Sequence, residues 1–461
     1  MRRLKVLVLA GAALWSPAAH ADPEKPPPRM SAAVTARAPV YTLRRCLELA
    51  ARNYPKVAEA KARLRHKEAQ LSQAHTAPFS EWNLTAGVGP APTVRGTSIY
   101  SPNTDAALTS NMALAWQVGI DGVVPLWTFG KITNLWDAAE AQIKVGEHEV
   151  KREKNDVKMS VRRAFYGAQL ARDSLALVRE ATQRIDKHLG RLEARVADGD
   201  GDDIELLKLK MYRAELEARE SEAAKQERIA LAGLKFLIGS PSAVDIPDQP
   251  LRRVPHRLAP LGRYLEAARL FRPEVNMARA GVMARQAQVR LEQSRYFPDF
   301  GLALSGRYGR APEVTNQINP WVNDSANRFH YGAALALKWK LDFLPQSARV
   351  AQAQAQLEEI RATERYALGG VGTEVEQAFA EAVDAATRVD AYTRAQGYAR
   401  QWLIKVQQGI DVGTFEDEDV VSPAKEYALK RFAQMSAVYE YNIAIARLSQ
   451  ATGWDSIAPV D

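Results

Sequence analysis

The sequence predicts a mostly α-helical protein with transmembrane β-strands, built from two tandem structural repeats. Three observations support this fold class: very long proline-free helical patterns, short segments in which apolar and polar residues alternate, and the return of the whole pattern in the second half of the chain. A net charge of +8 on 461 residues is too mild to indicate a nucleic-acid partner. The single cysteine, Cys46, excludes an intramolecular disulfide framework, and we expect it to be a small apolar core residue.

Residues 1–21 have the features of an export signal. Arg2, Arg3 and Lys5 form a basic start, residues 7–15 are apolar, and Ala19-His20-Ala21 is typical of a cleavage site. We therefore expect a secreted chain that begins at Asp22. Residues 22–40 are rich in proline and are predicted to be extended.

The repeat is visible in residues that recur at a constant spacing. Six residues recur 218 positions later, ending with Pro55 as Pro273: Leu43, Arg45, Leu47, Glu48, Ala50 and Pro55. Farther along, Val161, Phe165, Gly199, Ile229 and Gly239 recur 214 positions later. This spacing predicts repeat 1 at residues 41–239 and repeat 2 at residues 261–454, joined by a proline-rich linker at 240–260.

Each repeat is predicted to begin with a helix and continue with a β-hairpin. The hairpins, at about 82–124 and 299–342, show apolar residues at every second position, as in Phe300, Leu302 and Leu304. Aromatic residues lie near the two ends of the apolar faces: Trp82, Trp127, Phe300 and Trp339 at one end, and Tyr308, Phe329 and Tyr331 at the other. The pattern fits either a sheet on a soluble core or a lipid-facing surface, and the aromatic ends favour the second.

Long helices at about 128–197 and 346–412 follow the hairpins, and return helices are predicted at about 203–238 and 417–452. Val161, Ala168 and Leu175 mark a seven-residue apolar repeat in the first long helix, which predicts helices that wind around one another. Gly369, Gly370 and Gly372 are expected to weaken or bend the second long helix.

The predicted strands imply an oligomer if they span a membrane. An open strand edge leaves backbone groups unsatisfied in hydrocarbon, and four strands are too few to close a barrel with room inside. Three chains would supply twelve strands. We therefore predict a homotrimer with a 12-stranded β-barrel, continued by a long α-helical coiled-coil barrel.

The order of these elements resembles the TolC-like outer-membrane efflux protein family, also called outer membrane factors. The resemblance covers about residues 41–454 and includes the paired Pro55 and Pro273, the turn Val412-Gly413-Thr414, and Tyr439-Glu440-Tyr441 in the return helix. It implies an outer-membrane channel-tunnel, extending into the periplasm, of a tripartite efflux or type I secretion system. Such a channel passively conducts substrates from an inner-membrane pump, with a periplasmic adaptor protein as a further partner. The alternative is a non-conducting periplasmic coiled-coil adaptor or an envelope scaffold.

The candidate site residues lie at the two helical turns. The first turn contains Asp198, Gly199, Asp200, Asp202 and Asp203; the second contains Asp411, Gly413, Glu416, Asp417, Glu418 and Asp419. These carboxylates either cap helix starts or form a ring at the periplasmic mouth. The resemblance places Asp419 at a constriction aspartate, whereas Ser422 stands where the family has a second one. Many pump-coupled relatives have Val-Gly-Leu where this chain has Asp198-Gly199-Asp200.

Two lysines of the last strand, Lys338 and Lys340, are predicted to line the barrel near its periplasmic end, either as solvated wall residues or as selectivity residues. No catalytic spacing, metal-ligand set or cofactor motif stands out, so we expect no enzyme activity, no bound metal and no cofactor.

Overall fold

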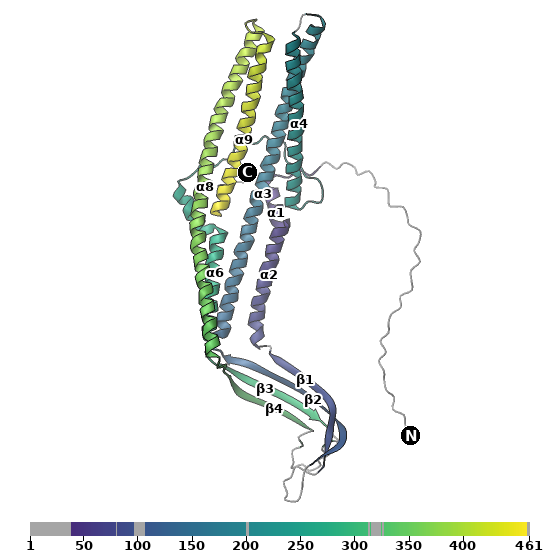
Figure 1. Cartoon of the computed structure of the whole chain (residues 1–461), viewed down its shortest axis with the longest axis vertical. Helices are drawn as coiled ribbons and strands as arrows, with labels where there is room; N and C mark the ends of the chain where they lie inside the picture. The colour runs from purple at the N-terminus through teal and green to yellow at the C-terminus, as the bar shows by residue number, and fades with distance from the viewer. Residues whose placement is uncertain are drawn as a thin grey trace, which may run out of the picture. The chain divides into compact units, whose positions relative to one another are not determined.

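The computed structural model describes residues 38–79, 81–95, 107–199, 202–311, 314, 324 and 327–458. The predicted export signal and most of the segment 22–40 lie outside these residues. Pro39–Asp461 forms one compact unit, and its described part is shown in Figure 1.

The same series of elements occurs twice in this unit. The first series is α1 (Leu43–Asn53), α2 (Pro55–Thr76), β1 (Trp82–Arg95), β2 (Ala107–Trp127), α3 (Lys131–Ala197) and α4 (Asp203–Ile238). The second is α5 (Leu261–Phe271), α6 (Pro273–Ser294), β3 (Asp299–Arg310), β4 (Arg328–Lys338), α8 (Phe343–Asp411) and α9 (Val421–Thr452). Short 3-10 turns lie at Ala77–Phe79, Asp417–Val420 and Asp455–Ile457. The predicted fold class, mostly helical with strands in two tandem repeats, is confirmed.

Pro55 and Pro273 divide the first helix of each repeat into two. Each proline occupies the first turn of the second helix, where its missing N–H costs nothing. The preceding residues, Tyr54 and Arg272, are extended, with ψ of 128° and 123°. Steric contact with the proline ring disfavours helical ψ at that position, so the chain breaks there rather than continuing as one helix.

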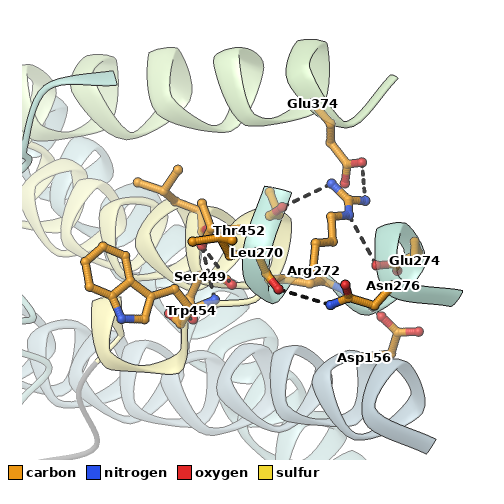
Figure 2. Close-up of polar contacts among 12 residues, drawn as sticks. Asp156, Leu270, Arg272, Glu274, Asn276, Glu374, Ser449, Thr452 and Trp454 are labelled. Carbon is orange, nitrogen blue, oxygen red and sulfur yellow. Dashed lines mark hydrogen bonds and ion pairs between the residues drawn. The ribbon is translucent and has the colours of Figure 1, made fainter. Parts of the chain in front are cut away.

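Arg272 connects this break to the long helices of repeat 2 (Figure 2). Its side chain is buried, and its guanidinium donates to the carbonyl of Ala451 in α9 at 3.1 Å and to Glu274 in α6 at 3.2 Å. It also pairs with Glu374 in α8. A buried guanidinium is tolerated only when its donors are satisfied, so these contacts hold α6, α8 and α9 together at the α5–α6 break.

The long helices pack through small residues. Val161 and Ala168 in α3, and Val375 and Ala382 in α8, are fully buried in the main core cluster. Alanine at such positions lets neighbouring helix backbones approach closely. α8 runs without interruption through Gly369, Gly370 and Gly372, whose Cα atoms face open space. The expected weakening therefore produces no break in the helix.

The linker between the repeats is held against the helical core. Val244, Ile246 and Val254 are buried, and the side chain of Asn442 in α9 accepts from the Val254 N–H at 2.9 Å and donates to the Arg252 carbonyl at 2.8 Å. Because proline cannot donate a backbone hydrogen bond, a segment this rich in proline depends on such side-chain partners.

The four strands form one antiparallel sheet in the order β1-β2-β3-β4. In Figure 1 the strands follow the ends of α2 and α6, and the tips of the α3–α4 and α8–α9 hairpins lie at the opposite end of the helices.

Candidate transport pathway: the two sheet faces and the hairpin tips

One face of the sheet is apolar across all four strands. The register aligns Leu84 with Ile120 in β1 and β2, and Leu302 with Leu335 in β3 and β4. Apolar and polar residues alternate along each strand, and the register places apolar residues beside apolar residues. The apolar side chains of the four strands therefore share one face. In the single chain this face is open: Leu84 is 73% exposed and Leu335 is 81% exposed. A soluble protein would cover so large an apolar surface.

Aromatic side chains gather at both ends of this apolar face. Toward the ends of the strands remote from the helices, Trp116 contacts Tyr308 with ring centroids 5.4 Å apart, and Phe329 contacts Tyr331 at 5.6 Å. Near the helices, Phe129 stacks on Phe297 at 5.2 Å and lies close to Trp127 and Phe300. Two aromatic belts that flank an apolar band are typical of the two interfaces of a lipid bilayer.

The opposite face of the sheet is polar and lined largely by small residues. One row across the sheet runs Thr85, Gly119, Arg307 and His330, and the next runs Asn83, Asp121, Ser305 and Gly332. Glycine and alanine occupy many of the remaining positions, such as Gly87, Gly309 and Ala334. This face can border water. The apolar packing on it among the described residues is a small cluster of Ala113, Ala311 and Val314.

Both edges of the sheet are open in the described residues. β1 pairs only with β2, and β4 pairs only with β3. An edge strand exposes a row of unpaired N–H and C=O groups, which hydrocarbon does not tolerate. The sheet therefore requires further strands if its apolar face contacts lipid.

The tip of the second hairpin is a tight, specific turn. α8 ends at Asp411, and Gly413 adopts a φ of +77°, a conformation that suits glycine. The N–H groups of Thr414 and Phe415 both donate to the carbonyl of Gly409, at 2.7 and 3.3 Å. The Phe415 ring lies against Gly409 so closely that a Cβ there would be 2.2 Å from a ring carbon.

Gly409 is thus a turn residue that sequence reasoning missed. The sequence feature that could have indicated it is a glycine in the last turn of the predicted helix, four residues before Gly413.

Asp419 and Glu416 are brought together at this tip. A carboxylate oxygen of Asp419 accepts from the Glu416 N–H at 3.0 Å, and the Asp419 N–H donates to the Glu416 carbonyl at 3.0 Å. Asp411, Glu416 and Asp419 are all exposed. Asp417 and Glu418 lie in the 3-10 turn that precedes α9. Within one chain, Asp419 therefore acts as a cap of its own turn.

The tip of the first hairpin has a similar arrangement. Asp198 follows the end of α3, and Gly199 has a φ of +80°. Asp202 caps α4 by accepting from the Ile204 N–H at 2.7 Å, and Asp203 begins the helix. The capping interpretation thus describes Asp202. Asp200 lies outside the described residues.

The two predicted lumen lysines differ in position. Lys338 is the last residue of β4 and aligns with Asp299 on the polar face. Lys340 lies beyond the strand and forms an ion pair with Asp342 at 2.9 Å. The strand prediction was therefore too long here, because apolar alternation continues to Leu341 although ladder pairing stops at Lys338.

The sequence profile of the outer membrane efflux protein family matches residues 46–240 and 264–454 of this chain. The chain belongs to the outer membrane efflux protein family. It is an outer-membrane channel of an efflux or secretion system that extends into the periplasm, and proteins of this family are channels rather than enzymes. None of the described helices is long and apolar enough to cross a membrane.

Similar proteins agree with this assignment. Protein CyaE of Bordetella pertussis strain Tohama I is 25% identical over 342 residues, which are 73% of this chain and 68% of that protein. The open-state structure of the Neisseria gonorrhoeae MtrE outer membrane channel has a TM-score of 0.73 and 15% identity, with 89% of this chain and 88% of that chain covered. A Pseudomonas aeruginosa membrane protein has a TM-score of 0.72 and 19% identity, with 89% and 92% covered. These structures share the fold of this chain.

Within the described ranges, no three His, Cys, Asp or Glu side chains lie close enough together to hold a metal ion.

Proposed function

We propose that this chain forms a homotrimeric duct whose twelve strands close a barrel in the outer membrane and whose helices form a periplasmic tunnel. The observation that carries this proposal is the four-stranded sheet with an open edge on β1, an open edge on β4 and one predominantly apolar face. Pairing β4 of one copy with β1 of the next would satisfy both edges. Threefold closure would then turn the apolar face toward lipid and the polar face toward water.

The exposed carboxylates at the tip of the second hairpin would form the charged mouth of this duct. A threefold axis through the tunnel would bring three copies of the second tip toward one another, with Asp411, Glu416 and Asp419 exposed on each. A ring of carboxylates attracts cations and repels anions. We assign Asp419 to this ring together with its capping role, and Asp417 and Glu418 to the same turn. At the other end of the tunnel, Lys338 would line the barrel wall where it meets the helices.

The hairpin tips would also be the contact region for a periplasmic adaptor and an inner-membrane pump. The first tip is acidic, because Asp198 and Asp202 lie on either side of its turn. It therefore differs from the apolar Val-Gly-Leu turn of many pump-coupled relatives. Next to it, α4 carries an exposed apolar stripe of Ile204, Leu207 and Met211 at helical spacing. A stripe of this kind is suited to a partner helix.

The proposal is tested with the intact protein extracted from outer membranes in mild detergent. We expect a trimer by mass measurement in detergent, ion conduction after reconstitution into planar bilayers, and co-purification with an inner-membrane transporter after cross-linking in cells. A stable monomer that carries no current would contradict the proposed duct. If the trimers conduct ions but no transporter co-purifies, the proposed duct stands and the proposed pump partner is contradicted.

A further inference from the structure

The polar face of the sheet carries an excess of positive charge in the half remote from the helices. Two arginines lie there with exposed side chains, Arg307 on β3 and Arg328 on β4, and the exposed imidazole of His330 is a polar neighbour on β4. We call Arg307 and Arg328 the cationic belt. The register aligns Arg307 directly with His330, and it places Arg328 two residues earlier in β4, opposite Gly309.

The Arg307 side chain lies along the sheet, where the neighbouring residue is a glycine. Its neighbour in the row is Gly119, and a Cβ at Gly119 would lie 3.3 Å from Arg307 Nε and 3.2 Å from the Thr85 hydroxyl oxygen. The glycine thus leaves room for the guanidinium to pass over β2 toward Asp121, with 3.6 Å between the charged atoms.

Little negative charge offsets this belt. Among the described residues of the four strands, the carboxylates on the polar face are Asp121 and Asp299. Asp324 precedes β4 and accepts from the Asn327 N–H and side-chain amide, at 3.2 and 2.8 Å. Asp299 is at the opposite end of β3 and already pairs with Lys131 at 2.8 Å. Asp121 forms an ion pair with Arg307. This pair is weak because both side chains are about half exposed. Arg328 and His330 form no ion pair within the described part of the chain.

We propose that the cationic belt is an anion-selective zone of the barrel lumen, which favours solutes carrying carboxylate, sulfate or phosphate groups at the outer end of the duct. This inference rests on the proposed trimeric duct, because closure of the barrel turns the polar face inward and repeats the belt three times. The neighbouring positions on this face include Gly87, Gly309 and Gly332, which have no side chains that could cover the two arginines. Repeated cations inside a narrow, low-dielectric wall concentrate anions.

The belt is tested by ion selectivity in planar bilayers under a KCl gradient. The test protein is the full-length trimer with the double substitution Arg307→Gln and Arg328→Gln. The matched control is Arg310→Gln, since Arg310 belongs to the same strand but aligns with Trp116 on the apolar face. We expect the double variant to raise the K⁺ to Cl⁻ permeability ratio on the order of threefold, since it removes six charges from the trimer lumen, and the control to match the wild type.

A second readout separates the belt from the duct itself. Binding of citrate to the detergent-solubilised trimer, measured by calorimetry, does not require conduction, and we expect the double variant to lose it while Arg310→Gln retains it. If the wild type carries no current but binds citrate and the double variant does not, the duct is contradicted and the two arginines remain an anion-binding surface of the sheet. If the wild type conducts but has the same ion selectivity and citrate binding as the double variant, the proposed role of the belt is contradicted and the duct is not.

Discussion

At the tip of the second hairpin, the Asp419 carboxylate already has a partner within its own chain. It accepts the Glu416 N–H, and this bond closes the turn that leads into α9. The carboxylate can therefore act in two separate ways: its oxygen accepts the hydrogen bond that closes the turn, and its negative charge contributes to the proposed mouth. Alanine would remove both contributions, whereas asparagine keeps an acceptor of the same size and removes only the charge.

We expect Asp419→Asn to keep the trimer intact and to weaken block of the current by divalent cations by about tenfold, because three charges leave the mouth. The measurement is titration of Mg²⁺ against single-channel current in planar bilayers. Asp202→Asn is the matched control, since the Asp202 carboxylate also accepts a backbone N–H at a hairpin tip, that of Ile204. Equal block in wild type and Asp419→Asn would remove Asp419 from the mouth and leave it as a cap.

Among the elements, the linker shows how a segment without regular structure can be held in place. Asn442 is 1% exposed, and its side-chain amide bonds both the N–H of Val254 and the carbonyl of Arg252. Nearby, the Tyr441 hydroxyl donates to the His256 carbonyl, and Arg253 lies over the Tyr441 ring. α9 thereby anchors the connection between the repeats.

Asn442→Ala should destabilise the protein by about 1–3 kcal/mol, because it leaves buried backbone groups of the linker without partners. The measurement is the rate of limited proteolysis within residues 240–260, together with the thermal midpoint of the trimer. Gln169→Ala is the control. Gln169 also donates to the linker, at the Gln249 carbonyl, but its bond is 3.4 Å long and exposed. Similar proteolysis rates in the two variants would show that Asn442 does not hold the linker.

At the scale of the whole molecule, the two faces of one sheet determine where the chain can reside. Adjacent residues of β4 make this contrast sharp. Leu335 aligns with Leu302 on the apolar face, and Ala336 aligns with Gly301 on the polar face.

Leu335→Lys should reduce the yield of outer-membrane trimer strongly, because a lysine facing the middle of the bilayer costs about 2–4 kcal/mol in each copy. Ala336→Lys adds the same side chain one residue later, toward the lumen, and should assemble normally. Quantifying trimers in membrane fractions on mildly denaturing gels distinguishes the two. Equal yields would mean that the apolar face does not contact lipid.

Much of this architecture follows from local pattern. Pro55 and Pro273 impose the helix breaks through their own ring geometry, and the alternation in β3 predicts its two faces because the side-chain period of a strand is two residues. The duplicated residues predict that both halves fold alike. Membership of an outer-membrane channel family was accessible for the same reason, since the order of elements carries the resemblance.

The tertiary structure decided what depends on contacts between distant residues. The end of β4 at Lys338, rather than beyond Lys340, depends on where its ladder with β3 stops. The packing of Phe415 on Gly409, the burial of Arg272 between three helices, and the row that joins Arg307 to His330 also require the chain to be folded. Periodicity specifies which residues share a face, but the register between strands and the approach of one helix to another are set by packing across the whole molecule.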